Sequence, residues 1–440
     1  MSLERIGELR HVVLAGAPEA QNTGAHRGEE YSRSIAAGRR VRVFLLGSML
    51  LLPLAVVPGV AQPFSRPQLT LLTTVVLLGL VVCTHRLKAA WSELPLVLQM
   101  ALAAWIASIS AAATRGEFVS PACLILPLVG IGWLVVLMAA KQRPQELAWV
   151  LMFSGGALAA LAVAQYIGAD PFSLLGWVPS SYGSERMRVF ATLGNPNFVA
   201  AFLSGLLPLT FSLVGSFRSP YLPAGFFVLQ AAALFATGSR APVLGLAAAG
   251  LWLAILRSRT TATRFMLAAL SITLLATFFS PARDLRTTLR GRLYVWKVAA
   301  PHLREHFLLG LGPGGFGAAF PLWETQYWQA SPASERDRMF AGIEDHAHND
   351  YLEILADYGT FGLLAFLTAV FAFLGTAWTG TRAAPDSLVA GASAGVVALL
   401  AVALVDFPLM RPAEAFLLWS LVAVSLLKIR NNSESLKTRE

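Results

Sequence analysis

The chain has 440 residues, of which 56% are hydrophobic and only 13% carry a charge, whereas soluble domains carry charges on about 25% of their residues. So large an apolar fraction excludes an ordinary soluble domain and favours the bilayer as solvent. The net charge of +9 would suit nucleic acid, but the basic residues flank apolar segments and form no stripe, so no nucleic-acid partner is expected. Cys83 and Cys123 lie in apolar runs and predict no disulfide.

Residues 1–40 are polar and contain no long apolar run, so we expect a loosely ordered tail without a secretory signal. Apolar windows of about twenty residues then recur and predict an all-α integral membrane protein. We expect about twelve transmembrane helices, at 41–60, 67–85, 94–113, 119–140, 147–168, 196–215, 220–238, 241–257, 264–280, 359–378, 386–405 and 412–428.

These spans divide the chain into five parts. A tail covers 1–40, nine helices occupy 41–280, a long loop covers 281–358, three helices occupy 359–428, and a short tail covers 429–440. An even number of spans places both termini on one side of the membrane. The positive-inside rule favours the cytoplasm as that side, because the basic residues of the short loops gather there, as Arg86, Lys88, Lys141, Arg143, Arg257, Arg259 and Arg264. We therefore expect a bacterial inner-membrane protein whose loop 281–358 is periplasmic.

Within this loop, residues 289–307 have the pattern of an amphipathic helix. An apolar stripe recurs at helical spacing and comprises Leu289, Leu293, Trp296, Ala300, Leu303 and Phe307. Such a helix either lies on the membrane surface or caps the helical bundle. We expect Arg290, Lys297 and Arg304 to form its solvated face, with Arg292 at the margin of the stripe.

A glycine-rich segment follows at 308–320. No βαβ unit surrounds it, so it is not a dinucleotide fingerprint, and we expect a turn that packs the loop onto the bundle. Next come Trp323, Tyr327 and Trp328, which are typical either of an interfacial aromatic belt or of side chains that stack on sugar rings.

Two histidines end the loop, in an acidic segment that contains Glu344, Asp345, His346, His348, Asp350 and Glu353. Three interpretations are open: a metal site, a general base tuned by a carboxylate, or hydrogen-bonded structural histidines. No third metal ligand stands out, so no metal is expected. The residue types alone do not decide between a general base and structural histidines.

Polar residues also mark the start of the span 196–215. Asn195 suits the cap of that helix and Pro196 its first turn, which accounts less well for Asn197. Arg188, just upstream, has the position of an interfacial anchor.

Two further arginines fall near outer loops. Arg240 lies between apolar spans, where an arginine is costly, so a functional role is favoured over snorkelling to the interface. Asp406 and Arg411 bracket Pro408 in the last outer loop, where they can simply pair with each other.

Together these segments resemble the bacterial O-antigen ligase and O-antigen polymerase superfamily, and the ligase most. The resemblance rests on GNPNF at 194–198, SRAP at 239–242, RLYVWK at 292–297, LGLGPGGF at 309–316 and HNDYLEILADYGTFG at 348–362. The family signature is His-Asn, nine residues, Gly, two residues and a second Gly. Here His348 and Asn349 are followed at that spacing by Gly359 and Gly362.

The resemblance implies a metal-independent, inverting glycosyltransferase without a cofactor. The enzyme would move an O-antigen glycan from undecaprenyl diphosphate to a lipid A core sugar. His348 would be the catalytic histidine, with His346 as a helper.

By the same resemblance, Arg240 and Arg292 would bind the diphosphate, with Arg188 as a weaker member of that set. Asn195, Asn197, Asn349 and Asp350 are possible supporting residues. In-line displacement at the anomeric carbon would put His348 across a cavity from Arg240 and Arg292.

Two alternatives remain. An O-antigen polymerase or a protein O-oligosaccharyltransferase would use the same chemistry with another acceptor. A membrane transporter has less support, because few carboxylates lie within the spans and no internal repeat is evident.

Overall fold

The computed structural model describes residues 38–116, 119–174, 176, 189–215, 219–256, 265, 285–330, 337, 339–340 and 344–438. Residues 1–45 and 46–440 form separate units, and the larger one holds every labelled element below. It contains the helices α3 (Ser65–Val82), α4 (Thr84–Ser92), α5 (Leu96–Arg115), α6 (Pro121–Ala139), α7 (Pro144–Tyr166), α8 (Pro171–Leu174), α9 (Pro196–Val214), α10 (Tyr221–Thr237), α11 (Ala241–Leu256), α13 (Leu285–Leu303), α14 (Gly315–Ala330), α16 (Asp350–Ala383), α17 (Ser387–Val402) and α18 (Pro412–Lys437), and the short 3-10 helices η1 (Leu52–Leu54) and η2 (Pro408–Met410).

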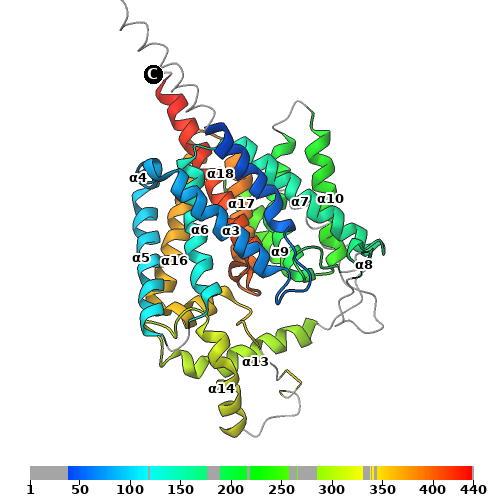
Figure 1. The fold of residues 1–440 in the computed structure, drawn as a ribbon, viewed down its shortest axis with the longest axis vertical. Coiled ribbons are helices and arrows are strands. Elements are labelled where there is room, and N and C mark those ends of the chain that lie inside the picture. Colours follow the sequence, from blue (N-terminus) through cyan, green and yellow to red (C-terminus); the bar gives the residue numbers. More distant parts are fainter. Residues whose placement is uncertain are drawn as a thin grey trace, which may run out of the picture. The chain divides into compact units, whose positions relative to one another are not determined.

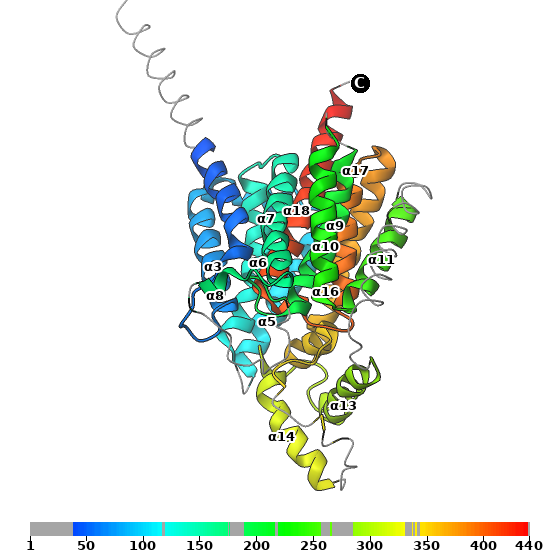
Figure 2. The ribbon, with the colours of Figure 1, turned by 90° about the vertical axis from the view of Figure 1, so that its right-hand side faces the viewer.

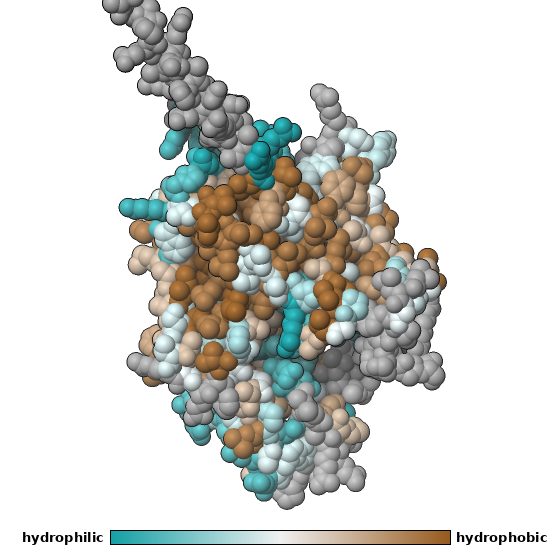
Figure 3. All heavy atoms as spheres, viewed as in Figure 1, coloured by the Kyte–Doolittle hydropathy of each residue, from teal (hydrophilic) through white to brown (hydrophobic). Residues whose placement is uncertain are grey.

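Within the described residues, seven helices are long and apolar enough to cross a membrane, namely α3, α5, α6, α7, α9, α16 and α18. Three shorter apolar helices, α10, α11 and α17, accompany them. Each of these helices overlaps a predicted span, although α16 and α18 extend beyond the predicted 359–378 and 412–428. The chain is therefore an all-helical, multi-pass membrane protein. The space-filling view shows the broad apolar surface that such a protein presents to lipid (Figure 3).

Two predicted spans do not follow this pattern. The span 264–280 lies outside the described residues, apart from Phe265. The span 41–60 was too long, because helix is continuous only over 38–51 and gives way to η1 and then to a turn. Pro53 and Pro58 explain the early end, since proline has no N–H to donate to a helix.

Helix α18 is the centre of the bundle. It packs against α3, α6, α7, α9 and α17, and 89% of its most apolar window is buried. A helix that is apolar on all sides is expected in such an interior position. Polar contacts add specificity, because the indole N–H of Trp133 on α6 donates to the hydroxyl of Ser420 on α18 over 2.9 Å.

Helices α13 and α14 lie at one end of the bundle, as Figures 1 and 2 both show. Their apolar side chains form a cluster with residues from the start of α16, among them Tyr294, Phe316, Phe320, Trp323 and Ala356. Trp323 is thus a core residue that stacks on His302, which was not among the roles expected for it.

The expected amphipathic helix is present as α13, but another face of it meets the protein. Tyr294, Val295, Val298 and Ala299 are buried, and the Tyr294 hydroxyl donates to Glu324 over 2.7 Å. Of the predicted stripe, Leu289, Leu293 and Phe307 are 44%, 57% and 49% exposed. Leu303 of the same stripe is buried and Trp296 packs against the cluster. The stripe is therefore only partly exposed, and a second apolar face, which the periodicity did not separate from it, caps the bundle.

Candidate functional site

The candidate site is built on the turn that leads into α16. His348 has a φ of 50°, a left-handed conformation that costs a residue with a side chain about 1–2 kcal/mol. The next residue caps the helix, because Asn349 Oδ1 accepts a hydrogen bond from Leu352 N–H over 3.0 Å. The chain therefore turns sharply at His348 before the helix begins.

Asn349 and Asp350 also tie this turn to the segment between α17 and α18. The Asn349 amide donates to the Leu404 carbonyl over 3.1 Å. The buried Asp350 carboxylate accepts from Leu409 N–H over 2.9 Å, and Asp350 N–H donates to the Ala403 carbonyl over 2.9 Å. In this structure both residues therefore hold the framework of the site together.

His348 lies between two carboxylates. Its Nε2 is 3.4 Å from Glu344 Oε2 and its Nδ1 is 3.9 Å from Asp406 Oδ1. Burial disfavours the charged imidazole, but the contacts with Asp406 and Glu344 outweigh it and raise the pKa of His348 to about 9. His348 is therefore mainly imidazolium at neutral pH.

His346 is more firmly fixed than His348. Its Nδ1 is 2.7 Å from Glu353 Oε1, and the other oxygen of Glu353 accepts from Ala347 N–H over 3.1 Å. The ring stacks on Phe407, with 4.1 Å between ring centroids. Burial opposes protonation of His346, but Glu353 more than offsets this and raises its pKa.

Asp406 continues the network to Arg411. Arg411 Nη1 is 3.6 Å from Asp406 Oδ2, and its Nε is 2.8 Å from Glu414 Oε1. Burial alone would raise the pKa of Asp406, but Arg411 and His348 outweigh it and lower that pKa to about 2. The expected pairing of Asp406 with Arg411 is confirmed, and Asp406 additionally contacts the candidate catalytic histidine.

Arg292 reaches the same region from α13. One turn further along that helix, the indole N–H of Trp296 donates to the Ala347 carbonyl over 2.8 Å, between the two histidines. Arg292 is half-buried, and burial lowers its pKa while Asp406 opposes the shift. The Asp406 carboxylate and the Arg292 guanidinium therefore lie within electrostatic reach of each other.

Arg240 immediately precedes α11. The Trp252 indole donates to Ser393 Oγ over 3.0 Å, and Gly245 packs against Ala398 and Val402. Helix α11 therefore runs antiparallel to α17. The start of α11, next to Arg240, lies beside the C-terminal end of α17. Helix α17 ends at Val402, four residues before Asp406.

Arg188 lies outside the described residues. The predicted cap of α9 is confirmed, because Asn195 Oδ1 accepts from Asn197 N–H over 2.9 Å. Phe198, in the same turn, has its ring centroid 3.8 Å from the guanidinium carbon of Arg411. The start of α9 is thus linked to the Asp406 network.

The glycine-rich loop packs onto α16 as expected. Leu311 N–H donates to the Ala356 carbonyl over 2.8 Å, and the Asp357 carboxylate accepts from Gly314 and Phe316 N–H over 2.7 and 3.0 Å. At the kink of α16, Gly359 has a φ of 69° and lies against the Leu308 carbonyl. The segment from His348 to Gly359 therefore runs from the turn before α16 to the kink where the glycine-rich loop docks.

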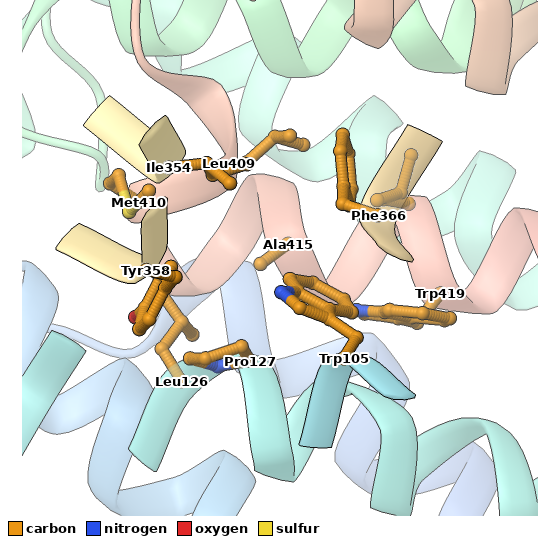
Figure 4. Close-up of a pocket in the computed structure, with 11 residues that line it drawn as sticks. Trp105, Leu126, Pro127, Ile354, Tyr358, Phe366, Leu409, Met410, Ala415 and Trp419 are labelled. Atoms are coloured by element: carbon orange, nitrogen blue, oxygen red, sulfur yellow. The ribbon is translucent and has the colours of Figure 1, made fainter. Parts of the chain in front are cut away.

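A small apolar cavity lies behind η2, lined by Trp105, Tyr358, Leu409, Trp419 and their neighbours (Figure 4). Its volume of about 30 Å³ matches the share of one water molecule in the liquid. It is therefore too small for a sugar or a prenyl chain. Among the described residues, no three His, Cys, Asp or Glu side chains are grouped as metal ligands, and metal independence stays a prediction.

Sequence reasoning did not assign roles to Glu344, Glu353 or Glu414. The available signal was the cost of an ionisable residue in or beside an apolar span, which applies to Glu353 at the start of α16 and to Glu414 at the start of α18. Their partners are near in sequence, since Glu344 pairs with His348, Glu353 with His346 and Glu414 with Arg411. Sequence proximity alone did not show which of the acidic residues point toward these partners.

Comparison with known proteins shows what a part of the chain resembles. No curated protein matches the chain. Residues 225–367 match the family model described as O-antigen ligase, a segment that contains Arg240, Arg292, the glycine-rich loop and both histidines. The resemblance expected from the sequence is therefore confirmed over residues 225–367, which are similar to the O-antigen ligase family.

Proposed function

We propose that the protein is a lipid-linked glycan transferase of the O-antigen ligase type. It moves a glycan from undecaprenyl diphosphate to a hydroxyl of a lipid A core sugar, with inversion and without a metal ion. The reaction takes place at the periplasmic face of the bacterial inner membrane, and both termini of the chain lie in the cytoplasm. The observation that carries the proposal is the position of His348 between Glu344 and Asp406, with Arg292 within electrostatic reach of Asp406.

His348 is the general base of the proposed reaction. Asp406 orients the ring from the Nδ1 side, which leaves Nε2 for the acceptor hydroxyl. The hydroxyl takes the place of Glu344, now 3.4 Å away. As the hydroxyl oxygen bonds to the anomeric carbon, its proton passes to Nε2 and the bond to the diphosphate breaks, leaving the electron pair on the diphosphate. Asp406 then stabilises the imidazolium.

The same carboxylates set the conditions under which His348 can act. Only the neutral imidazole accepts a proton, and a pKa of about 9 keeps it mainly protonated at neutral pH. A base with a high pKa accepts a proton strongly, but only a small fraction of it is unprotonated when the pH lies below that pKa. Transfer should therefore accelerate with rising pH.

In this proposal, arginines bind and stabilise the leaving diphosphate. The departing diphosphate gains negative charge in the transition state, which forked hydrogen bonds from Arg240 and Arg292 stabilise, with Arg188 as a further candidate. Partial burial of Arg292 strengthens such a contact, because less water competes for the phosphate oxygens. His346 acts as a helper that keeps the turn of His348 in place through Glu353 and Phe407.

The deciding experiment mixes purified protein and undecaprenyl-diphosphate-linked glycan with three acceptors in separate reactions. These are a lipid A core glycolipid, a second carrier-linked glycan and a serine-containing peptide. The ligase proposal predicts that the glycolipid gains the glycan, and that NMR shows an inverted anomeric linkage. Elongation of the carrier-linked glycan would identify a polymerase, and a modified peptide a protein transferase. Activity lost with a chelator and restored by a divalent ion would contradict the metal-free mechanism.

A further inference from the structure

A second, larger cavity opens where α3, α9 and α18 begin. Its volume is about 270 Å³, near the lower limit of roughly 300–1,000 Å³ for pockets that hold small organic ligands. It is lined by Gln62, Ser65, Gln68, Asn195, Phe198 and Arg411, together with Phe64, Glu414 and neighbouring backbone. The space-filling view shows a hollow with hydrophilic side chains below the apolar belt (Figure 3).

The charges around this cavity nearly balance. Three helix N-termini meet there, at Ser65, Pro196 and Pro412, and each carries a partial positive charge. Arg411 adds a full positive charge, but it contacts the carboxylates of Asp406 and Glu414. A diphosphate would meet the Glu414 carboxylate in the wall, and Asp406 already offsets the charge of Arg411, so the cavity favours a neutral, hydroxyl-rich ligand.

Arg411 supplies unused hydrogen-bonding capacity at the wall of the cavity. Its side chain is 7% exposed, and its Nη2 has no hydrogen-bond partner among the described residues. A buried donor without a partner is costly, and a ligand oxygen would relieve that cost. The amides of Gln62 and Asn195 can donate as well as accept, and the ring of Phe198 adds an apolar surface.

The cavity shares its wall with the histidine turn. Phe198 contacts Phe407, with 5.7 Å between ring centroids, and Phe407 in turn stacks on His346. Asp406 contacts both Arg411 and His348, so one side chain links the two. A sugar held in the cavity would therefore lie one layer of side chains away from the proposed base.

We propose that this cavity binds one neutral sugar unit of a glycan substrate and so positions the chain for transfer. The inference rests on the proposed function, because that function supplies the glycans. The unit belongs either to the donor glycan or to the core acceptor, and the test below separates the two.

The test fills the cavity without touching the charged network. Ser65→Phe places a ring in the space, and Gln62→Ala is a milder variant should Ser65→Phe fail to fold. Thr70→Phe is the matched control, because Thr70 lies on the same helix but is exposed on its surface. Steady-state transfer is measured with donor and acceptor varied separately. We expect KM for one substrate to rise roughly tenfold, equivalent to about 1.4 kcal/mol, with kcat nearly unchanged.

A rise in the acceptor KM assigns the cavity to the core sugar, and a rise in the donor KM assigns it to the donor glycan. A second measurement does not depend on turnover: saturation-transfer NMR of free core oligosaccharide and free repeat-unit oligosaccharide in the His348→Ala background. Binding that Ser65→Phe or Gln62→Ala abolishes and Thr70→Phe retains supports the cavity, even if no acceptor is glycosylated. Unchanged KM values and unchanged NMR binding in both cavity variants would overturn the inference while leaving the transferase proposal intact.

Discussion

Nδ1 of His348 lies 3.9 Å from Oδ1 of Asp406, although 57 residues separate them along the chain. This relationship joins the start of α16 to the segment before α18. It also carries the electrostatics of the site, because Asp406 holds its negative charge with a pKa of about 2 and helps to raise the pKa of His348 to about 9.

The first prediction concerns pH. A histidine that must be neutral to act loses activity as the pH falls below its pKa, so kcat/KM should rise with pH through a limb near 9. In Asp406→Asn the charge that favours imidazolium is gone, so the limb should move to lower pH, while kcat falls because the ring is less well oriented. Rate profiles of both proteins check this. A limb that stays in place or moves upward would contradict the role of Asp406.

The second prediction separates Arg292 from its neighbour on α13. Arg292→Ala should lower kcat by roughly 10²–10³-fold, the usual effect of removing one group that stabilises developing charge, and should weaken donor binding less. Arg290→Ala is the control, because Arg290 is exposed on the same helix and should retain its rate. Single-turnover rates and donor titrations provide the comparison. Equal losses in the two variants would point to the helix rather than to the guanidinium.

The third prediction concerns the kink of α16. Gly359 combines a φ of 69° with a ψ of −174°, a region that side chains essentially exclude and that costs about 1–3 kcal/mol. A Cβ there would also meet the Leu308 carbonyl. Gly359→Ala should therefore lower the apparent melting temperature in detergent and displace the glycine-rich loop.

Gly375→Ala is the matched control on the same helix, since nothing lies within 4 Å of a Cβ at that position. Alanine in a helix interior is better than glycine by about 1 kcal/mol, so this variant should melt at the same temperature or higher. A Gly359→Ala protein as stable as Gly375→Ala would show that the docking of Gly359 against Leu308 does not matter.

The membrane helices were predictable because a run of about twenty mainly apolar residues is the length that spans a bilayer as a helix, as α6 and α18 illustrate. Local rules also succeeded at Asn195, whose capping role depends only on its immediate neighbours. The early end of the first helix at η1 shows how a proline can overrule hydropathy. In α13, two apolar faces lie side by side, and only the packing of Tyr294 and Val298 decides which one is buried.

The candidate site was predictable in part. The motif predicted a role for His348 and the resemblance one for Arg292, and both stay predictions. The contacts of His348 with Asp406 and of Arg411 with Phe198 bring together separate helices. Such contacts depend on tertiary packing, which no local pattern encodes. The exposed stripe of Leu289 and Leu293 is likewise visible only once the other face of α13 is covered.

The most direct test of the central claim compares His348→Ala with His85→Ala, an exposed histidine far from the site in sequence. Both proteins are purified and given undecaprenyl-diphosphate-linked glycan and the lipid A core acceptor. If His348 is the base, its replacement lowers kcat by roughly 10²–10⁴-fold while donor binding persists, and His85→Ala transfers glycan at the normal rate. Transfer by His348→Ala at the rate of His85→Ala would contradict the proposed mechanism.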